Sequence, residues 1–228
     1  MDWLSEIVEG ARRALDETNA AREETLALSR EIIRTSANTI RAVHRSEFAQ
    51  AAEMLAQART AAARLRQRLQ DKPALYATGY VHDCQKELAE AALTLALVKG
   101  DAVPGPADLE VELPAFLNGM GEAVGELRRH VLDVIRGGEL DRGETILQRM
   151  DDIYSALVTF DYPDAMTGGL RRTTDSVRGI LEKTRGDLTT SLRQDQLRDA
   201  IGRALAALSP ADSKILPHAP RTGRPPHD

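Results

Sequence analysis

The chain has 228 residues and a formal net charge of −5, which allows one or two domains of about 150 residues each and neither indicates nor excludes a nucleic-acid partner. Alanine, leucine, arginine and glutamate dominate, and aromatic residues make up only 4%, which is the composition of an all-helical protein. The single cysteine, Cys84, excludes an intramolecular disulfide, and the most apolar run, residues 91–98, is far short of the roughly 20 residues of a membrane span. The first residues also lack the layout of a signal peptide, so we expect an intracellular, cytoplasmic protein with no membrane partner.

Apolar residues recur at intervals of three or four along most of the chain, which predicts an all-α bundle of long antiparallel helices. Ser46 is a favourable N-cap for the second helix, and Gly100 and the pair Gly137-Gly138 are suitable stops for the third and fourth. We expect one all-helical domain over residues 1–208, followed by a proline-rich tail over 209–228 that has too little apolar surface to become ordered. The seven predicted helices span about residues 3–44, 46–69, 73–100, 113–136, 141–160, 165–192 and 194–208. The first segment is consistent with one helix or with two nearly collinear ones.

Two pairs of glutamates lie on the predicted helices that flank the loop over residues 101–112. Glu87 and Glu90 are three residues apart on one helix, and Glu122 and Glu126 are four apart on the next. These spacings bring side chains to one side of a helix, about 5–6 Å apart at Cβ. If the helices pair as an antiparallel hairpin, the four carboxylates form a negative pocket that opposes folding unless a hard cation such as Mg²⁺ fills it. The alternative is that all four glutamates simply cover a solvated face of alanine-rich helices.

Two further patterns favour a functional site over a solvated face. From Ala91 onward the third helix is apolar nearly all round, which predicts burial on several sides. Glu90 falls among the leucines of that buried surface, a poor position for a merely solvated carboxylate. The fourth helix contains Gly119, Gly121 and Gly125, each of which costs about 1 kcal/mol relative to alanine. These glycines predict the close approach of another helix or of a ligand's backbone; the alternative is a flexible helix with no special purpose.

The sequence around both glutamate pairs resembles the translin/Trax family, and more closely its Trax-like, catalytically equipped branch. The resemblance lies in KELAEA at 86–91 and FLNGMGEAVGEL at 116–127, with similar turns at VIRGGE (134–139) and FDYP (160–163). In outline it covers about residues 18–192. Plain translin subunits lack the first glutamate pair, so its presence argues against a purely structural subunit.

The resemblance implies a seven-helix fold that assembles into a hollow octameric shell, in which Trax subunits act as Mg²⁺-dependent endoribonucleases on single-stranded RNA. Glu87, Glu90 and Glu122 match the acidic catalytic residues of Trax, and Glu126 matches a further acidic position nearby. Trax subunits carry aspartate at the position of Glu122, so the extra methylene here moves that carboxylate. We therefore expect these four glutamates to bind Mg²⁺, or Mn²⁺ in its place, in a homo-octamer that binds single-stranded RNA and, as a further candidate, single-stranded DNA.

Arginines that could hold the backbone of such a substrate lie at several positions, although most surface arginines are only solvated. The most basic stretch of the chain lies on the second helix and just before it, and Arg128 and Arg129 lie beside the second glutamate pair. The arginines of the basic stretch are Arg41, Arg45, Arg59, Arg64, Arg66 and Arg68.

Two other functions compete with the nuclease. A nucleic-acid-binding shell without catalysis needs only the basic helix and the assembly surface. A diiron helical bundle needs Glu-x-x-His pairs, and the spacing from Glu126 to His130 is one residue too long. We expect His130 on the surface or beside the site, His82 as a histidine on a helix face and Cys84 as a small buried thiol.

Overall fold

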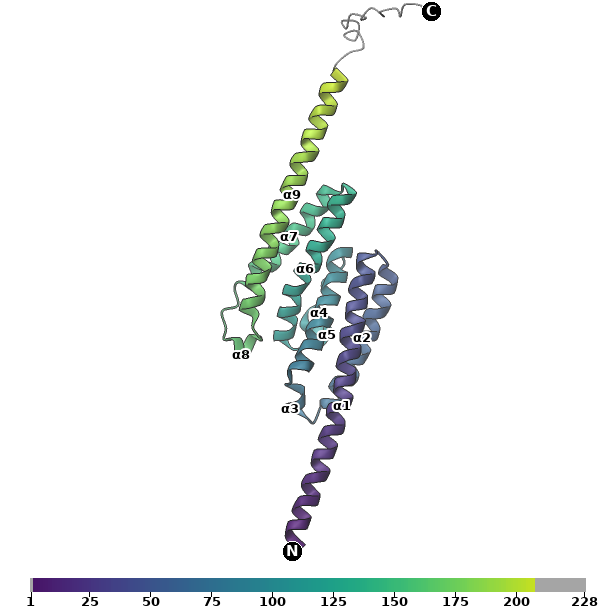
Figure 1. The fold of residues 1–228 in the computed structure, drawn as a ribbon, viewed down its shortest axis with the longest axis vertical. Helices are drawn as coiled ribbons and strands as arrows, with labels where there is room; N and C mark the ends of the chain where they lie inside the picture. Colours follow the sequence, from purple (N-terminus) through teal and green to yellow (C-terminus); the bar gives the residue numbers. More distant parts are fainter. Residues whose placement is uncertain (1, 208–228) are drawn as a thin grey trace, which may run out of the picture. The chain divides into compact units, whose positions relative to one another are not determined.

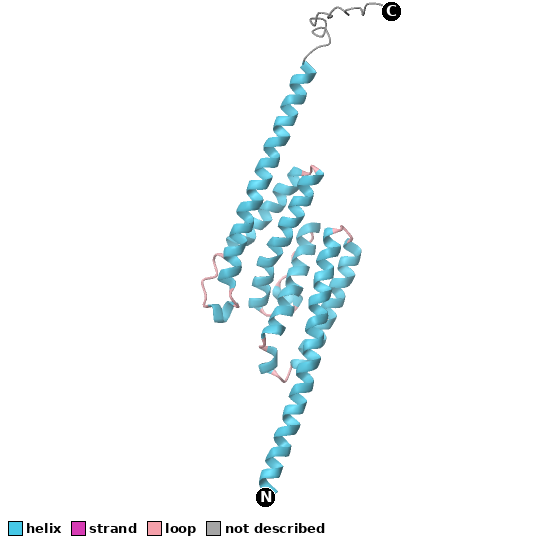
Figure 2. Ribbon diagram, viewed as in Figure 1, coloured by secondary structure: helices cyan, strands magenta, loops and turns pink. Residues whose placement is uncertain are grey.

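A computed structural model describes residues 2–207 of the chain, and this described part consists of helices and the turns between them, without strands (Figures 1 and 2). The all-α prediction is therefore confirmed. The chain divides into two units at Leu188, and the contacts given below lie within the first. The tail expected over residues 209–228 lies outside the described residues, and the extent of a single domain over 1–208 stays a prediction.

Within residues 2–207, six long helices form the fold and three single-turn helices lie in the connections. The long helices are α1 (Asp2–His44), α2 (Phe48–Leu69), α4 (Gly79–Lys99), α6 (Leu113–Gly137), α7 (Leu140–Leu157) and α9 (Leu170–Ala207), and the short ones are α3 (Pro73–Tyr76), α5 (Pro106–Leu109) and α8 (Asp164–Thr167).

Helix α4 is the central helix of the first unit, because it packs against α1, α2, α6 and α7 (Figure 1). Every residue from Ala91 to Val98 is buried, as the apolar surface on all sides of this segment predicts. The first half of α4 is more polar and follows the seam with α6. Two of the four glutamates singled out in the sequence therefore lie on the most enclosed helix of the unit.

Two helices end at the glycines that the sequence predicted as their C-terminal stops, whereas the prediction of Ser46 as an N-cap was wrong. Gly100 and Gly138 follow α4 and α6 with φ of 80° and 78°, the left-handed conformation that glycine adopts without strain. Ser46 also has a positive φ, of 60°, and it belongs to the turn before α2. Glu47 occupies the N-cap position and makes no side-chain capping hydrogen bond.

The predicted boundaries differ from the structure in three other places. The expected helix from residue 165 onward is divided, because α8 ends at Thr167 and α9 begins at Leu170 after two glycines with positive φ. The expected helix over 73–100 is divided, because α3 ends at Tyr76 and α4 starts again at Gly79 after an extended Thr78. The break expected near residue 193 is absent, and α9 continues from Leu170 to Ala207. No proline or glycine lies between residues 187 and 201, so nothing in the backbone chemistry interrupts the helix there.

Two of the three glycines singled out in the interior of α6 allow another helix to approach closely, which confirms the prediction for these positions. A Cβ atom at Gly119 would lie 2.5 Å from the backbone oxygen of Lys86 on α4. A Cβ atom at Gly121 would lie 2.3 Å from Cγ2 of Thr173 on α9. At Gly125 the nearest atom would be 4.0 Å away, so this glycine has room for a side chain.

Across residues 2–207, we find no helix with the combination of length and apolar sequence that crossing a bilayer requires.

Candidate metal centre

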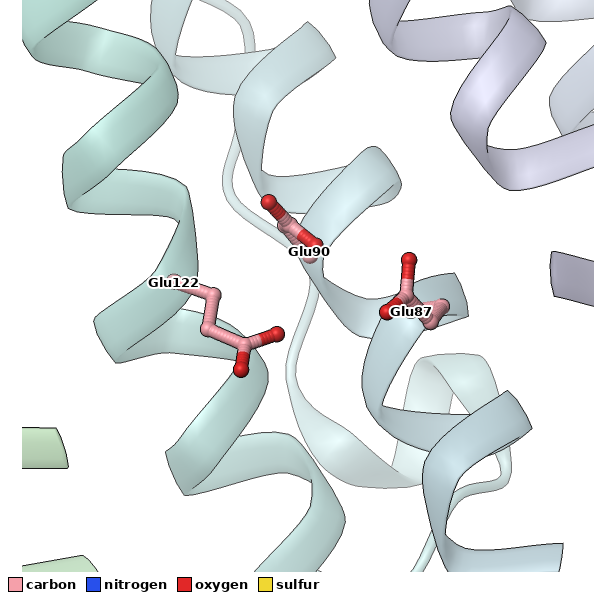
Figure 3. A group of neighbouring side chains, drawn as sticks. All are labelled: Glu87, Glu90 and Glu122. Carbon is pink, nitrogen blue, oxygen red and sulfur yellow. The ribbon is translucent and has the colours of Figure 1, made fainter. Parts of the chain in front are cut away.

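Three of the four predicted glutamates meet at the seam between α4 and α6. Glu87 and Glu90 project from α4, and Glu122 extends toward them from α6 (Figure 3). Each side chain offers one carboxylate oxygen, and these three oxygens lie within 4.8 Å of one another. Glu90 is buried with 9% of its surface exposed, while the other two are half-buried. We call these three residues the carboxylate cluster.

The cluster holds more negative charge than its surroundings compensate. Burial is the largest cause that raises the pKa of Glu90 to about 8, and the charges of Glu87, Glu122 and Glu126 raise it further. Burial also raises the pKa of Glu87, where the charge of Lys86 opposes it. For both groups, burial and the neighbouring negative charges together outweigh the nearby positive charge. The cluster therefore has the electrostatic character of a cation site.

Lys86 supplies part of the missing positive charge. Its Nζ atom donates a hydrogen bond to Oε1 of Glu122 at 2.6 Å. Burial lowers the pKa of Lys86, but the hydrogen bond and the charge of Glu122 outweigh it and raise the pKa overall. One ammonium group beside three carboxylates leaves the cluster negative when all of them are ionised.

Glu126 lies close to the cluster but is hydrogen-bonded elsewhere. Nε2 of His44, at the end of α1, lies 2.5 Å from Oε2 of Glu126. This hydrogen bond lowers the pKa of Glu126 against the opposing effect of burial. Its charge still raises the pKa of Glu90, so the two groups interact. Direct metal ligation by Glu126 stays a prediction, and the partner His44 could not be found from spacings on the glutamate helices.

The donor set fits a hard divalent cation. All three groups of the cluster are carboxylates, and oxygen donors are the ligands that Mg²⁺ and Mn²⁺ prefer. Thiolate and imidazole, which favour Zn²⁺ and other softer metals, do not belong to the cluster among the described residues. The carboxylate cluster is therefore a candidate magnesium or manganese site.

The other polar residues singled out in the sequence lie outside the cluster. His130 is buried with 7% exposure, which contradicts the surface position, while a position beside the site stays a prediction; burial lowers its pKa. His82 is a partly buried histidine whose ring lies against the position of Gly168. Cys84 is buried, as expected, and burial raises the pKa of its thiol to about 11.

A cavity of about 430 Å³ opens beside the cluster and brings in residues that sequence reasoning missed. It is lined by residues of α4 and α6 together with residues from the first turns of α9. A stretch of α9 far along the chain carries no motif that would have connected it with the glutamates. We call this space the carboxylate cavity, and its lining residues are Glu90, Gly121, Glu122, Arg172, Thr173, Ser176 and Ile180.

Several of the arginines expected to hold a substrate have partners within the chain. Arg66 pairs with Glu110, and Arg68 lies 2.5 Å from Glu24. Arg128 donates hydrogen bonds to Asp187 at 2.8 Å and to Thr184. These contacts occupy side chains that the sequence left as candidates.

The fold and the site define a class: an all-helical protein in which two packed central helices present a partly buried carboxylate cluster to a cavity. No model of a known protein family matches the chain. The uncharacterized protein MJ0175 of Methanocaldococcus jannaschii is 34% identical over 193 residues, which are 84% of this chain and 85% of that protein. Its description names no function.

Solved structures give the family. The crystal structure of AfC3PO matches 82% of this chain and 97% of its own with a TM-score of 0.76 and 33% identity. A complex of AfC3PO with duplex RNA matches over the same shares with a TM-score of 0.72. Apo-NeC3PO, at 18% identity and a TM-score of 0.74 over 81% of this chain and 96% of its own, shares the fold. The chain belongs to the translin/Trax family, among its C3PO-type proteins.

Proposed function

We propose that the protein is a metal-dependent endoribonuclease that cleaves single-stranded RNA, with Mg²⁺ or Mn²⁺ in the carboxylate cluster. The observation that carries the proposal is a set of three converging carboxylates, one with a pKa of about 8, at the wall of a cavity. Perturbed carboxyl groups beside a cavity are typical of catalytic sites. The complex of AfC3PO with duplex RNA supports RNA as the ligand, and the resemblance to Trax supports a single strand.

In this proposal Glu87, Glu90 and Glu122 hold the ion, and Glu126 adds negative charge beside them. When bound, a divalent ion of this kind activates water and offsets the charge on a phosphodiester. Glu90 must release its proton before it can bind a cation. Lys86 fixes the Glu122 carboxylate through the 2.6 Å hydrogen bond, and the burial of Glu90 strengthens every charge interaction at the cluster by excluding water.

Removing one carboxylate of the cluster should stop cleavage without unfolding the protein. We expect Glu87→Ala and Glu122→Ala to lose about a hundredfold or more in the cleavage rate of an unstructured RNA, because each loses a ligand of the ion. EDTA should stop the wild-type reaction, and added Mg²⁺ or Mn²⁺ should restore it. Gel analysis of end-labelled RNA gives the rates.

Glu53→Ala is the matched control, since Glu53 is an exposed glutamate on α2, and this variant should cleave at the wild-type rate. Undiminished cleavage in both cluster variants would remove the proposal. Tight binding of RNA by a wild-type protein that neither ion makes active would instead establish a shell that binds nucleic acid without catalysis.

We also propose that the chain assembles with further copies of itself, as the expected homo-octamer requires. The first turns of α1 carry an apolar stripe that no other described residue covers. Trp3, Ile7 and Leu15 are 67%, 59% and 67% exposed, and their spacing places them on one side of the helix. An exposed stripe of large apolar side chains is typical of an association surface.

The assembly can be tested by measuring the mass of the particle in solution. The wild type should have eight times the chain mass of 24.9 kDa. The double variant Ile7→Glu/Leu15→Glu should form smaller particles with unchanged helix content, because two charges in the stripe oppose its burial. Arg13→Glu changes the net charge by the same amount on the opposite, polar side of α1, and it should leave the mass unchanged. Equal masses for all three proteins would contradict assembly through this stripe.

A further inference from the structure

The part of α9 that lines the carboxylate cavity contains an arginine whose guanidinium group has no partner among the described residues. Arg172, Ser176 and Ile180 follow one another at intervals of four residues, so they share one side of α9 and line the cavity. The Arg172 guanidinium makes no hydrogen bond or ion pair with any described residue. Two other arginines of α9, Arg178 and Arg185, lie within 3.3 and 2.8 Å of aspartates.

A network of buried hydrogen bonds fixes the position of this wall. Asn118 of α6, which is buried, donates to the backbone oxygens of Pro114 and Thr167 at 2.8 Å each. Its Oδ1 atom accepts a hydrogen bond from the hydroxyl of Thr173 at 2.6 Å. Because Thr173 directly follows Arg172, the first turn of α9 is held against α6 beside the glutamates.

From this arrangement we infer that Arg172 binds a backbone phosphate of the nucleic-acid strand whose phosphodiester lies at the carboxylate cluster. The inference rests on the proposed function. The cavity volume of about 430 Å³ lies within the range of about 300–1,000 Å³ that small-ligand sites occupy, which is enough for one nucleotide unit. A guanidinium group matches the geometry and charge of a phosphate. The Ser176 hydroxyl lines the same side of α9 and gives the phosphate or the ribose a second polar contact.

The lining also predicts how the strand is recognised. Among the described residues that line the cavity, none is aromatic, and Ile180 is the large apolar one. Stacking on aromatic rings is the usual way in which proteins hold the bases of a single strand, and this cavity does not offer it. Recognition here is therefore through the phosphate backbone and is independent of base sequence.

Arg171 provides a matched control on the adjacent position of the same helix. Its side chain lines a different cavity, of about 820 Å³, together with Asp161, Asp164 and Asp175. Both arginines are exposed, and either alanine variant removes one positive charge from the first turn of α9. A difference between the two variants therefore reports the local contact and not the general charge of the surface.

The test compares Arg172→Ala, Arg172→Lys and Arg171→Ala in the full chain on labelled oligouridylate and oligoadenylate. We expect Arg172→Ala to raise KM about tenfold on both strands, with little change in kcat. The slope of log(kcat/KM) against log salt should become less negative by about 0.7. Arg172→Lys should recover part of the loss, because it keeps the charge without the planar fork. Arg171→Ala should behave as the wild type.

Two further measurements separate this inference from the proposed function. Calorimetric titration with Mn²⁺ should give the same affinity for Arg172→Ala and the wild type, since Arg172 is not part of the cluster. Binding of phosphorothioate strands, which resist hydrolysis, should show the same ranking of variants even if the wild type proves inactive. The inference would be overturned by equal effects of Arg171→Ala and Arg172→Ala, or by loss of Mn²⁺ binding in Arg172→Ala. Loss of cleavage in the glutamate variants tests the proposed function and does not bear on Arg172.

Discussion

Glu90→Gln should make the metal-free protein more stable at alkaline pH. In the presence of Mg²⁺ or Mn²⁺, the same change should lower the rate of RNA cleavage about a thousandfold. Glutamine keeps the shape of the side chain, and its amide group donates hydrogen bonds to the neighbouring carboxylates. It cannot become a carboxylate ligand. Stability and activity should therefore move in opposite directions in a single variant.

The stability effect has a defined dependence on pH. The pKa of Glu90 rises from 4.5 in the unfolded chain to about 8 in the folded protein, so folding favours the protonated form. The stability due to this proton is fully present below pH 4.5 and is lost as the pH rises through 8. One pKa unit corresponds to about 1.4 kcal/mol, so ionised Glu90 costs the folded state on the order of 2 to 4 kcal/mol at alkaline pH.

Thermal unfolding of both proteins between about pH 6 and pH 9 measures this effect. The advantage of Glu90→Gln should grow with pH in EDTA. Mg²⁺ should raise the melting temperature of the wild type at the alkaline end and leave that of the variant unchanged. Glu53→Gln, at the exposed position on α2, should follow the wild type throughout. A constant difference between Glu90→Gln and the wild type across this range would contradict the electrostatic account of the cluster.

Gly119→Ala should destabilise the protein by about 3 kcal/mol and weaken metal binding about tenfold. The added methyl group would lie 2.5 Å from the backbone oxygen of Lys86 and 2.9 Å from Cβ of Ala89. Backbone atoms cannot turn aside as a flexible side chain can, so α4 and α6 must separate. Separation moves Glu87 and Glu90 on α4 away from Glu122 on α6.

Gly125→Ala, on the same helix, is the control for this prediction. Its methyl group would meet only Cδ1 of Ile180, at 4.0 Å, and alanine favours the helix by about 1 kcal/mol over glycine. We expect this variant to equal or exceed the wild type in melting temperature and to bind Mn²⁺ normally. If both glycine variants were equally stable, the close contact at Gly119 would not set the helix spacing.

The sequence predicted those elements of the fold that depend on local chemistry. Gly100 and Gly138 end helices because they adopt a left-handed backbone, and the apolar surface all round residues 91–98 requires burial. The position of Ser46 was misassigned, since a residue that suits an N-cap also fits the tight turn before it. The break expected near residue 193 had no basis in the backbone chemistry, because no proline or glycine lies between residues 187 and 201.

The candidate site was predictable only as far as spacing within a helix and the pairing of consecutive helices extend. Glu87, Glu90 and Glu122 could be grouped because their helices are neighbours in the chain. His44 and Arg172 come from helices at opposite ends of the chain, and their approach to the glutamates depends on tertiary packing. The sequence therefore indicated the acidic half of the site and left the partner of Glu126 and the α9 wall unseen.

The buried second half of α4 should be the segment of the first unit that unfolds last. Amide protons between Ala91 and Val98 are shielded on every side, so they should exchange with deuterated water only when the whole unit unfolds. Glu90 directly precedes this slowest-exchanging segment, and Glu87 lies about one turn before it. Local opening of the peripheral helices should therefore leave the backbone of α4 that carries Glu87 and Glu90 in place.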